Sequence, residues 1–266
     1  MYCSDVNFAA TWLEDIHEKA ELIDCGDFLL TRAYIENKKV FYPPILKTTQ
    51  CPENKNQFVT AFLKMKEISE RDNVPLEIRG LDESVIGLIP PGYKITFDDG
   101  ESDYIYLSSD LINLQGNKFH SKRNHIYRFY KQFPNHTFRE YLETDYEQVM
   151  QLCNHWSLPF ETQMIERALA NFKELELKIM VLFAENKLVG FSVNSMENST
   201  IAHTLFEKAD RTVEGAYQAL NNLTARALFQ NIKYVNRQSD MNIQGLRKSK
   251  QSYHPIQIVK KYKVTL

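Results

Sequence analysis

The chain has 266 residues, of which 43% are hydrophobic and 12% are aromatic. This is enough apolar material for one large domain or two compact ones, and it excludes a disordered, collagen-like or low-complexity protein. The 34 acidic and 32 basic side chains leave a net charge of -2, which excludes a histone-like protein with a basic surface throughout. DNA is therefore not an expected partner.

The four cysteines are far apart and form neither a CxxC pair nor a dense disulfide framework, which is typical of the reducing cytoplasm. The histidines have no partners at metal-ligand spacing, so no metal is predicted. Residues 1–15 contain no basic run followed by an apolar stretch, and no window approaches the ~20 apolar residues that span a bilayer. We expect a soluble cytoplasmic protein with no integral membrane segment, and its oligomeric state stays open.

Hydrophobic periodicity predicts an alternating order of helices and strands along the chain. A first helix is expected over residues 5–23, where Phe8, Trp12, Ile16 and Ile23 recur at roughly helical spacing. The other elements expected in the first half are a hairpin of 28–34 and 39–46, a helix over 54–72, strands at 75–80, 94–97 and 103–107, and a helix over about 116–133.

The second half repeats this order. Its expected elements are helices over 144–156 and 160–174, a hairpin of 178–185 and 187–196, a strand at 200–209, a helix over 214–231, a strand at 233–236, a helix over 243–252 and a strand at 255–264. The mixture predicts an α/β protein with helices packed on mixed sheets. The best boundary is near residue 140, giving domains 1–140 and 141–266.

Two stretches without any acidic residue interrupt the balance of charge. Residues 116–131 and 241–266 hold 5 and 6 of the 32 basic residues, which leaves 21 basic against 34 acidic residues, or -13, elsewhere. Such runs are either solvated helix faces or sites that converge on an anionic ligand, because Lys and Arg bind phosphate through charge-assisted hydrogen bonds. On the first stretch, Lys118, Lys122 and His125 are expected to share one helix face.

The segment FEKADRTVEGAYQALNN, residues 206–222, predicts a strand, a loop and the start of a helix. Glu207 and Lys208 end the strand, Asp210 lies in the loop, and Gly215 and Ala216 fall in the first helical turn. The free N–H groups at a helix start stabilise a phosphate or an oxyanion. The alternative is an ordinary strand-to-helix connection that contains a glycine.

The segment YVNRQSDMNIQGLRKSKQSYHP, residues 234–255, also follows a strand. Its short helix is expected to begin with Gly245 and to carry Arg247, Lys248 and Lys250 in its first turns. Cations near a helix start oppose its dipole at ~0.3–1 kcal/mol each, and a bound anion would remove this cost. In the alternative, Asp240 caps the helix and pairs with Arg237.

These two segments, together with DYIYLSSDLINLQGNKFHSKRNHIYRFYKQFP at residues 103–134, resemble the DUF2156 family, the C-terminal domain of phosphatidylglycerol lysyltransferases. The resemblance covers roughly residues 25 to 263. It implies two tandem acetyltransferase-like (GNAT) halves, a fold shared with Fem-type aminoacyl transferases. It also implies acyl or aminoacyl transfer from a thioester or an aminoacyl-tRNA ester to an amine or hydroxyl.

The resemblance leaves the donor open between coenzyme A thioesters and aminoacyl-tRNA. Acetyltransferases bind the coenzyme A pyrophosphate with a loop of the form R/Q-x-x-G-x-G/A, and DRTVEGAY retains Gly215 and Ala216 but lacks the first glycine. A tRNA donor fits the basic stretches, because phosphate neutralisation dominates RNA binding. Full lysyltransferases also carry a multi-span membrane region, which is absent from this sequence and argues against a lipid acceptor.

Acyl transfer requires alignment of the reactants and a proton acceptor for the incoming nucleophile. Glu207 is the predicted general base, and the alternative is a salt bridge to Lys208 or Arg211. Tyr217 and Tyr253 are predicted proton donors, or else packing residues. The residues predicted to bind the substrate or its anionic groups are Lys122, Arg123, Asn124, Lys208, Asp210, Gly215, Ala216, Asn236, Arg237, Asp240, Arg247 and Lys250.

A second hypothesis is a non-catalytic module that holds an RNA or a nucleotide on the same fold. It needs the basic residues but neither a base nor a proton donor. The transferase hypothesis needs both, with a small molecule or an aminoacyl-tRNA as substrate, so the two hypotheses differ in what Glu207 does.

Overall fold

The computed structural model describes residues 4, 7–15, 20–35, 38–46 and 53–266. The chain divides into two compact units. Unit 1 comprises Met1–Asp103, Ser239–Leu246 and Ile258–Leu266, and unit 2 comprises Tyr104–Gln238 and Arg247–Gln257.

Unit 1 is built on a seven-stranded sheet in the order β1-β2-β3-β5-β14-β6, with β4 paired to β2. The C-terminal strand β14 lies between β5 and β6 and is antiparallel to both, so residues distant in sequence complete this sheet. The strands are β1 (Glu21–Asp24), β2 (Phe28–Ile35), β3 (Lys38–Phe41), β4 (Ile45–Leu46), β5 (Glu77–Asp82), β6 (Lys94–Phe97) and β14 (Lys261–Thr265).

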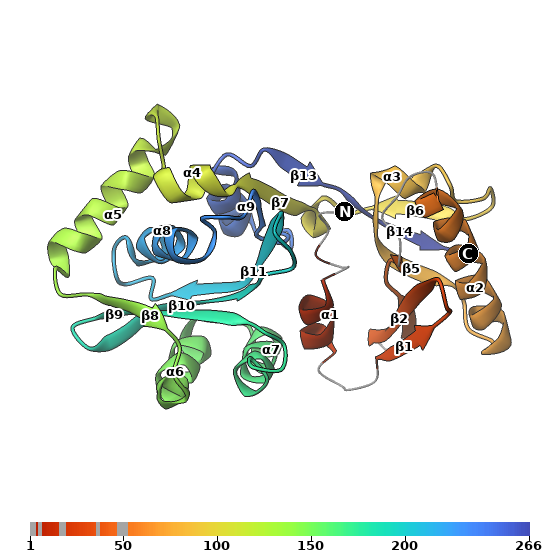
Figure 1. The fold of residues 1–266 in the computed structure, drawn as a ribbon, viewed down its shortest axis with the longest axis horizontal. Helices are drawn as coiled ribbons and strands as arrows, with labels where there is room; N and C mark the ends of the chain where they lie inside the picture. Colours follow the sequence, from red (N-terminus) through yellow and green to blue (C-terminus); the bar gives the residue numbers. More distant parts are fainter. Residues whose placement is uncertain (1–3, 5–6, 16–19, 36–37, 47–52) are drawn as a thin grey trace. The chain divides into compact units, whose positions relative to one another are not determined.

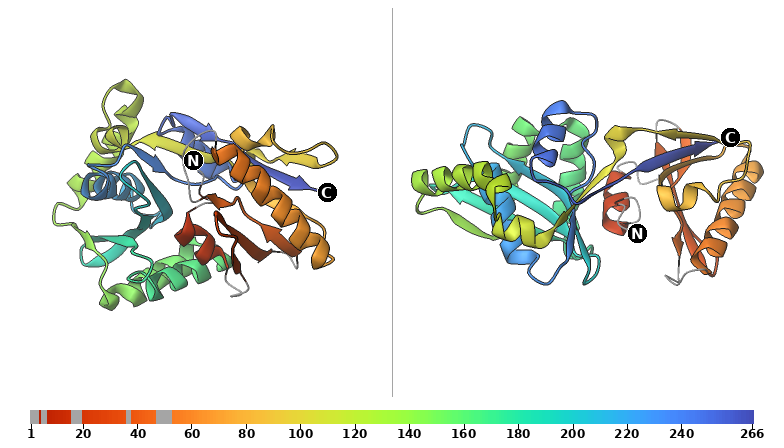
Figure 2. Two further views of the ribbon diagram at one scale, coloured as in Figure 1. Left: turned by 45° about the vertical axis from the view of Figure 1, so that its right-hand side comes forward. Right: turned by 90° about the horizontal axis from the view of Figure 1, so that it is seen from above.

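The helices of unit 1 are α1 (Phe8–Glu14), α2 (Glu53–Arg71) and α3 (Glu83–Ile86), and the short 3-10 turn η2 covers Asp99–Glu101. The long helix α2 covers one face of the sheet (Figure 2). Its buried residues Phe58, Phe62, Met65 and Ile68 recur every three or four positions and pack into one core with the sheet.

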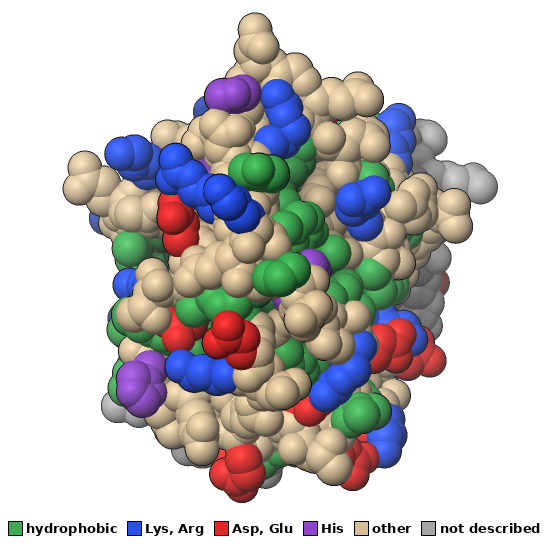
Figure 3. Space-filling view, turned by 90° about the vertical axis from the view of Figure 1, so that its left-hand side faces the viewer, with side chains coloured by type: hydrophobic (Ala, Val, Ile, Leu, Met, Phe, Trp, Pro, Cys, Tyr) green, Lys and Arg blue, Asp and Glu red, His purple; other side chains and the backbone are tan. Residues whose placement is uncertain are grey.

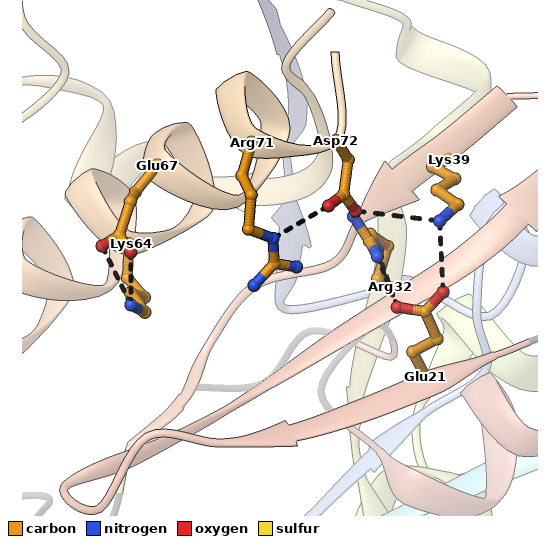
Figure 4. A network of polar contacts seen from close by, with 7 residues as sticks. All are labelled: Glu21, Arg32, Lys39, Lys64, Glu67, Arg71 and Asp72. Atoms are coloured by element: carbon orange, nitrogen blue, oxygen red, sulfur yellow. Dashed lines mark hydrogen bonds and ion pairs between the residues drawn. The ribbon is translucent and has the colours of Figure 1, made fainter. Parts of the chain in front are cut away.

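A buried arginine connects three strands of unit 1 with the end of α2 (Figure 4). The Arg32 side chain, on β2, is 4% exposed. Its Nη2 lies 2.5 Å from Glu21 on β1, and its Nη1 lies 2.7 Å from Asp72, which follows α2. Lys39 on β3 approaches both carboxylates, at 3.4 and 3.8 Å. The charge of Arg32 is therefore compensated inside unit 1.

Unit 2 is built on a second seven-stranded sheet, in the order β13-β7-β12-β11-β10-β9-β8. β11 and β12 are parallel, whereas the pairs β7–β12, β10–β11, β9–β10 and β8–β9 are antiparallel. The strands are β7 (Asp103–Leu107), β8 (Thr137–Glu140), β9 (Lys178–Ala184), β10 (Lys187–Ser195), β11 (Ile201–Ala209), β12 (Tyr234–Asn236) and β13 (Gln257–Val259).

Helices cover both faces of the unit 2 sheet, with α8 on one face and α6 and α7 on the other (Figure 1). α8 connects the parallel strands β11 and β12, as a parallel crossover requires. The helices are α4 (Ser108–Asn113), α5 (His120–Gln132), α6 (Tyr146–Trp156), α7 (Pro159–Ala170), α8 (Ala216–Leu228) and α9 (Gln244–Gln251), with 3-10 turns η3 (Asn117–Phe119) and η4 (Glu143–Asp145).

The parallel pairing of β11 with β12 is short, and it leaves one edge of β11 open where the candidate site lies. β12 pairs with β11 only from Ile201 to His203, whereas β11 continues to Ala209. In the described residues, the second half of β11 is therefore paired with β10 alone, and its other edge is left without a neighbouring strand. Glu207 lies on this open segment.

Most predicted elements are confirmed, with a few differences. The helix expected over 5–23 ends at Glu14, and Ile23 lies in β1, where it packs against the core from a strand. The helices α3 and α4 and the strand β8 were not predicted. The last expected strand is two strands, β13 and β14.

The units do not divide at residue 140, the boundary expected from the sequence. Residues 104–140 belong to unit 2, because β7 pairs with β12 and β8 pairs with β9. The C-terminal residues return to the sheet of unit 1. Strand pairing between distant segments carries no signal in the local periodicity on which the boundary was based.

Cys25 and Cys153 are free thiols, and Cys3 and Cys51 lie outside the described residues. None of the helices in the described part of the chain combines the length and the apolar character needed to cross a bilayer.

The Arg32 cluster predicts a pH-dependent stability. Hydrogen bonds from Arg32 and then Arg71 lower the pKa of Asp72 from 3.8 to about 2. Because the carboxyl is more acidic in the folded state, its contribution is complete above pH 3.8 and is lost as the pH falls toward 2. Asp72→Asn should lower the urea midpoint of unfolding at pH 7. The difference in midpoint between this variant and the unmodified protein should become smaller below about pH 4.

The matched control is Glu67→Gln, which removes an exposed i,i+3 pair with Lys64 on α2 (Figure 4). Exposed pairs contribute little, so this midpoint should stay close to that of the unmodified protein. If the midpoint of Asp72→Asn stays below that of the unmodified protein by the same amount from pH 7 to pH 3, the lowered pKa of Asp72 is not the source of the stability.

Candidate functional site

The Glu207 carboxylate is held by two side chains of unit 2. Its Oε1 accepts a hydrogen bond from Arg237 Nη2 at 2.9 Å, and its Oε2 accepts one from Asn221 Nδ2 at 3.0 Å. Arg237 directly follows β12, and Asn221 lies on α8. The salt bridge foreseen for Glu207 therefore exists, but its partner is Arg237 and not Lys208 or Arg211.

Arg237 is buried among aromatic rings. Its side chain is 9% exposed, and its Cζ lies 4.8 Å from the ring centroid of Tyr253 and 5.4 Å from that of Tyr106. Its Nη1 is buried and has no hydrogen-bond partner among the described residues, and the same holds for Asn221 Oδ1. The alternative in which Arg237 pairs with Asp240 is not observed, because Glu207 compensates its charge.

Lys122 faces the same aromatic ring. Its Nζ lies 4.2 Å from the ring centroid of Tyr253 and donates to Ser252 Oγ at 2.6 Å. Burial first, and then Arg237, lowers the pKa of Lys122 to about 8, while Glu207 opposes the change. Burial likewise raises the pKa of Tyr253 and of Tyr106, so both phenols stay protonated at neutral pH.

Lys122 does not lie on a solvated helix face, which is one of the two alternatives that the sequence leaves open for this stretch. Phe119, Lys122, Ile126 and Phe129 follow one another at intervals of three or four residues, and all four are buried. Lys122 thus lies on the core face of α5. This spacing was present in the sequence and could have revealed it.

The Lys250 amine supports the backbone beside Arg237. Its Nζ donates to the carbonyl oxygens of Arg237 and Gln238 at 2.5 and 3.0 Å, and Tyr106 donates its hydroxyl to the Lys250 carbonyl at 2.8 Å. Lys250 is buried and engaged with backbone carbonyls, so in this structure it holds the Arg237 segment in place.

The loop between β11 and α8 satisfies much of its own backbone. Asp210 Oδ1 accepts hydrogen bonds from the Thr212 N–H and hydroxyl, at 2.9 and 2.6 Å. The Val213 amide donates to the Asp210 carbonyl, and the Ala216 amide donates to the Val213 carbonyl. The amides of Thr212, Val213 and Ala216 are therefore occupied within the loop.

Gly215 is the N-cap of α8 and has φ +80°. A Cβ at this position would overlap the carbonyl oxygen of His125 on α5. The glycine therefore serves the close approach of α5 and α8. Ala216 is fully buried in the same contact region, at the start of α8.

A pocket of about 330 Å³ opens beside this loop, between α6 and the start of β10. Asp210 and Thr212 line it together with Trp156 and Lys187. Lys187 lies 3.5 Å from Asp210, and the guanidinium of Arg211 lies 5.2 Å from the Trp156 ring.

Three exposed basic residues of the first acid-free stretch have acidic or backbone partners. Lys118 pairs with Asp110 at 2.8 Å, and Arg128 pairs with Glu214 at 2.6 Å. Arg123 donates to the carbonyl oxygens of Leu114 and Gly116. On the face seen in Figure 3, basic side chains lie among acidic and apolar ones.

The helix α9 begins at Gln244, and it places Lys248 and Lys250 in its last turn. Cations there favour the helix dipole, so the conflict expected from the sequence does not arise. Arg247 is half-buried on the same helix. Asn236 accepts from the Gln238 amide, and Asp240, in unit 1, accepts from the Asn242 amide.

The other predicted site residues lie outside the Glu207 cluster. Lys208 pairs with Glu161 at 2.8 Å, and Asn124 is exposed on α5. Tyr217, on α8, is partly buried against the hydrophobic core of unit 2. The structure thus brings together Glu207, Arg237, Tyr253 and Lys122. Sequence reasoning missed Asn221 and Tyr106, because carboxamide and tyrosine side chains in apolar segments give no pattern of their own.

The sequence matches the family described as phosphatidylglycerol lysyltransferase, C-terminal, over residues 20–265. The chain belongs to this family. Its fold and family are those of a transferase, as the resemblance implied.

Three solved structures show how this family fold recurs. A protein of unknown function from Bacteroides thetaiotaomicron VPI-5482 is 26% identical, with a TM-score of 0.88 over 100% of this chain and 91% of that one. L-PGS from Bacillus licheniformis is 15% identical, with a TM-score of 0.72 over 97% and 86% of the two chains. A tandem GNAT protein from the clavulanic acid biosynthesis pathway is 8% identical, with a TM-score of 0.54 over 93% and 84%. The tandem GNAT-like fold predicted from the sequence is confirmed.

The contact at Gly215 predicts a loss of stability on substitution. Gly215→Ala places a Cβ against the His125 carbonyl and forces a left-handed conformation that costs ~1–2 kcal/mol for a residue with a side chain. We expect urea unfolding to show a loss of at least about 2 kcal/mol, since the clash adds to the conformational cost.

Gly245→Ala is the matched control, because a Cβ at Gly245 meets no atom within 4 Å and the residue is helical. It should change stability by no more than about 1 kcal/mol, in the stabilising direction. If both variants lose the same free energy of unfolding, the packing of α5 against α8 does not require a glycine at position 215.

Proposed function

We propose that this protein is an acyl or aminoacyl transferase in which an amine or hydroxyl attacks the carbonyl carbon of an activated donor. Membership of the family and the tandem GNAT-like fold support transfer chemistry. The observation that carries the proposal is the Glu207 carboxylate, which lies on the open segment of β11 and is oriented from two sides by Arg237 and Asn221.

In this proposal Glu207 takes the proton that the acceptor loses as its nitrogen or oxygen bonds to the carbonyl carbon. The two hydrogen bonds fix the orientation of the carboxylate and leave a lone pair on each oxygen for that proton. Tyr253, which stays protonated at neutral pH, supplies a proton to the leaving oxygen. The acceptor's bond to the carbonyl forms, and the bond between the carbonyl carbon and the leaving oxygen breaks.

We infer that the donor is an aminoacyl-tRNA ester rather than a coenzyme A thioester. Coenzyme A would place its pyrophosphate on free N–H groups at the start of α8. The amides of Thr212, Val213 and Ala216 are already used within that loop, and the carboxylate of Asp210 adds a repelling charge. An aminoacyl ester has no such pyrophosphate, and these loop contacts do not oppose it.

The test is transfer by purified protein from a mixture of aminoacyl-tRNAs, compared with acetyl-CoA. Glu207→Gln should lower the rate at least ~100-fold, because general acid–base catalysis contributes roughly 10²–10⁴-fold. Its circular dichroism spectrum should be unchanged, because glutamine has nearly the same shape and can still accept a hydrogen bond from Arg237, although the lost charge should lower the free energy of unfolding.

The control is Asp145→Asn, which alters another buried carboxylate–arginine pair of unit 2. Asp145 accepts two hydrogen bonds from Arg139 on β8, at 2.6 and 2.8 Å. β8 is three strands away from β11 in the sheet, so this variant should lose stability and keep its transfer rate. A Glu207→Gln variant that transfers at the unmodified rate would contradict the role of Glu207 as general base. Turnover of acetyl-CoA alone would contradict the inference that the donor is an aminoacyl-tRNA ester.

A further inference from the structure

Two cations of unit 2 share one aromatic ring. Lys122 Nζ and Arg237 Cζ both lie within 5 Å of the ring centroid of Tyr253, at 4.2 and 4.8 Å. They come from different elements, α5 and the residue after β12, and the fold holds both in place. Arg237 acts on Lys122 as a like charge in a buried site, so this arrangement needs a compensating group.

The charges facing Lys122 do not balance. Arg237 carries one positive charge and Glu207 on β11 carries one negative charge, so a protonated Lys122 leaves an excess of +1. From the segment after α9, Tyr253 and Ser252 contribute neutral groups, and Tyr106 on β7 is also neutral. Lys250 on α9 is a further cation, but it directs its amine to the carbonyls of Arg237 and Gln238, and the charges that shift the pKa of Lys122 are those of Arg237 and Glu207.

Burial makes this excess costly. The Lys122 residue and the Arg237 side chain are each 9% exposed, and the Glu207 side chain is 11% exposed. Burial of an uncompensated charge costs free energy. In a lysine this cost lowers the pKa, because the neutral amine is favoured over the ammonium group. The pKa of Lys122, lowered to about 8, shows this response.

The unpartnered donor indicates which kind of group is missing. Arg237 Nη1 is buried without an acceptor, although Nη2 of the same guanidinium is paired with Glu207. An acceptor with one negative charge would satisfy Nη1 and cancel the excess of +1. A dianion such as a phosphate monoester would reverse the imbalance instead.

We propose that Lys122 and Arg237 together bind one singly charged oxyanion, a carboxylate or a phosphodiester, and that Lys122 takes up a proton as the anion binds. This inference rests on the proposed function only in assigning that group to the donor or the acceptor of the transfer. By reciprocity, the anion binds more tightly when Lys122 is protonated, so its affinity falls as the pH rises above about 8.

The experiment follows the Cε signal of Lys122 by NMR between pH 6 and 11 in the full chain labelled with ¹³C-lysine. Lys122→Gln identifies the signal by its loss. Sodium acetate probes a carboxylate and sodium dimethyl phosphate probes a phosphodiester, with sodium chloride at equal ionic strength as the reference. At least one oxyanion should raise the titration midpoint of Lys122 by about one pH unit, which corresponds to a tenfold lower proton dissociation constant.

The oxyanion that raises the midpoint identifies the source of the group, and an effect of both supports the shared chemistry. Arg237→Gln should raise the midpoint without any anion, since it removes the neighbouring cation, and should abolish the response to either oxyanion. Lys131→Gln, on the same helix and exposed, should leave the Lys122 titration and its response unchanged.

A midpoint that neither oxyanion moves, or that chloride moves equally, would overturn the inference. The measurement needs no turnover, so a protein that fails the transfer assay but shows the shift separates this binding site from the proposed activity. The opposite result, transfer without the shift, would overturn only the anion site.

Discussion

Arg237 and Glu207 form a buried ion pair at the point where two parallel strands separate. β12 ends at Asn236, and the next residue extends its guanidinium to a carboxylate on the part of β11 that β12 no longer accompanies. Removing either partner would leave an uncompensated charge away from water, so each requires the other. The groups around the pair meet the same constraint: two protonated tyrosines, a carboxamide and a lysine whose pKa is lowered.

Two buried arginines, Arg32 and Arg237, illustrate different uses of the same side chain. Arg32 in unit 1 donates to carboxylates through Nε, Nη1 and Nη2, and it connects β1, β2 and the end of α2. Arg237 in unit 2 has one carboxylate partner and one buried N–H group without an acceptor. Every nitrogen of the Arg32 guanidinium donates within unit 1, whereas Arg237 retains a donor, and this difference is the basis of the anion site proposed above.

The loop before α8 shows how one sequence pattern can serve two purposes. Gly215 and Ala216 resemble the end of a phosphate-binding loop, and here they allow α8 to approach α5. The first glycine of that pattern is absent, and the side chain of Asp210 accepts a hydrogen bond from the Thr212 amide in the same loop. Spacing alone does not distinguish these uses, because both require a small residue at a helix start.

The sequence by itself determined the type and order of most helices and strands, because local periodicity and turn residues depend on near neighbours. It also determined the family, through three motifs in register, and it placed Glu207, Arg237 and Tyr253 among the candidate site residues. Only the tertiary structure decided that Glu207 pairs with Arg237, that Lys122 lies in the core and that β14 completes the sheet of unit 1. Each of these depends on contacts between segments far apart in the chain, and such pairings follow from packing and charge compensation in three dimensions.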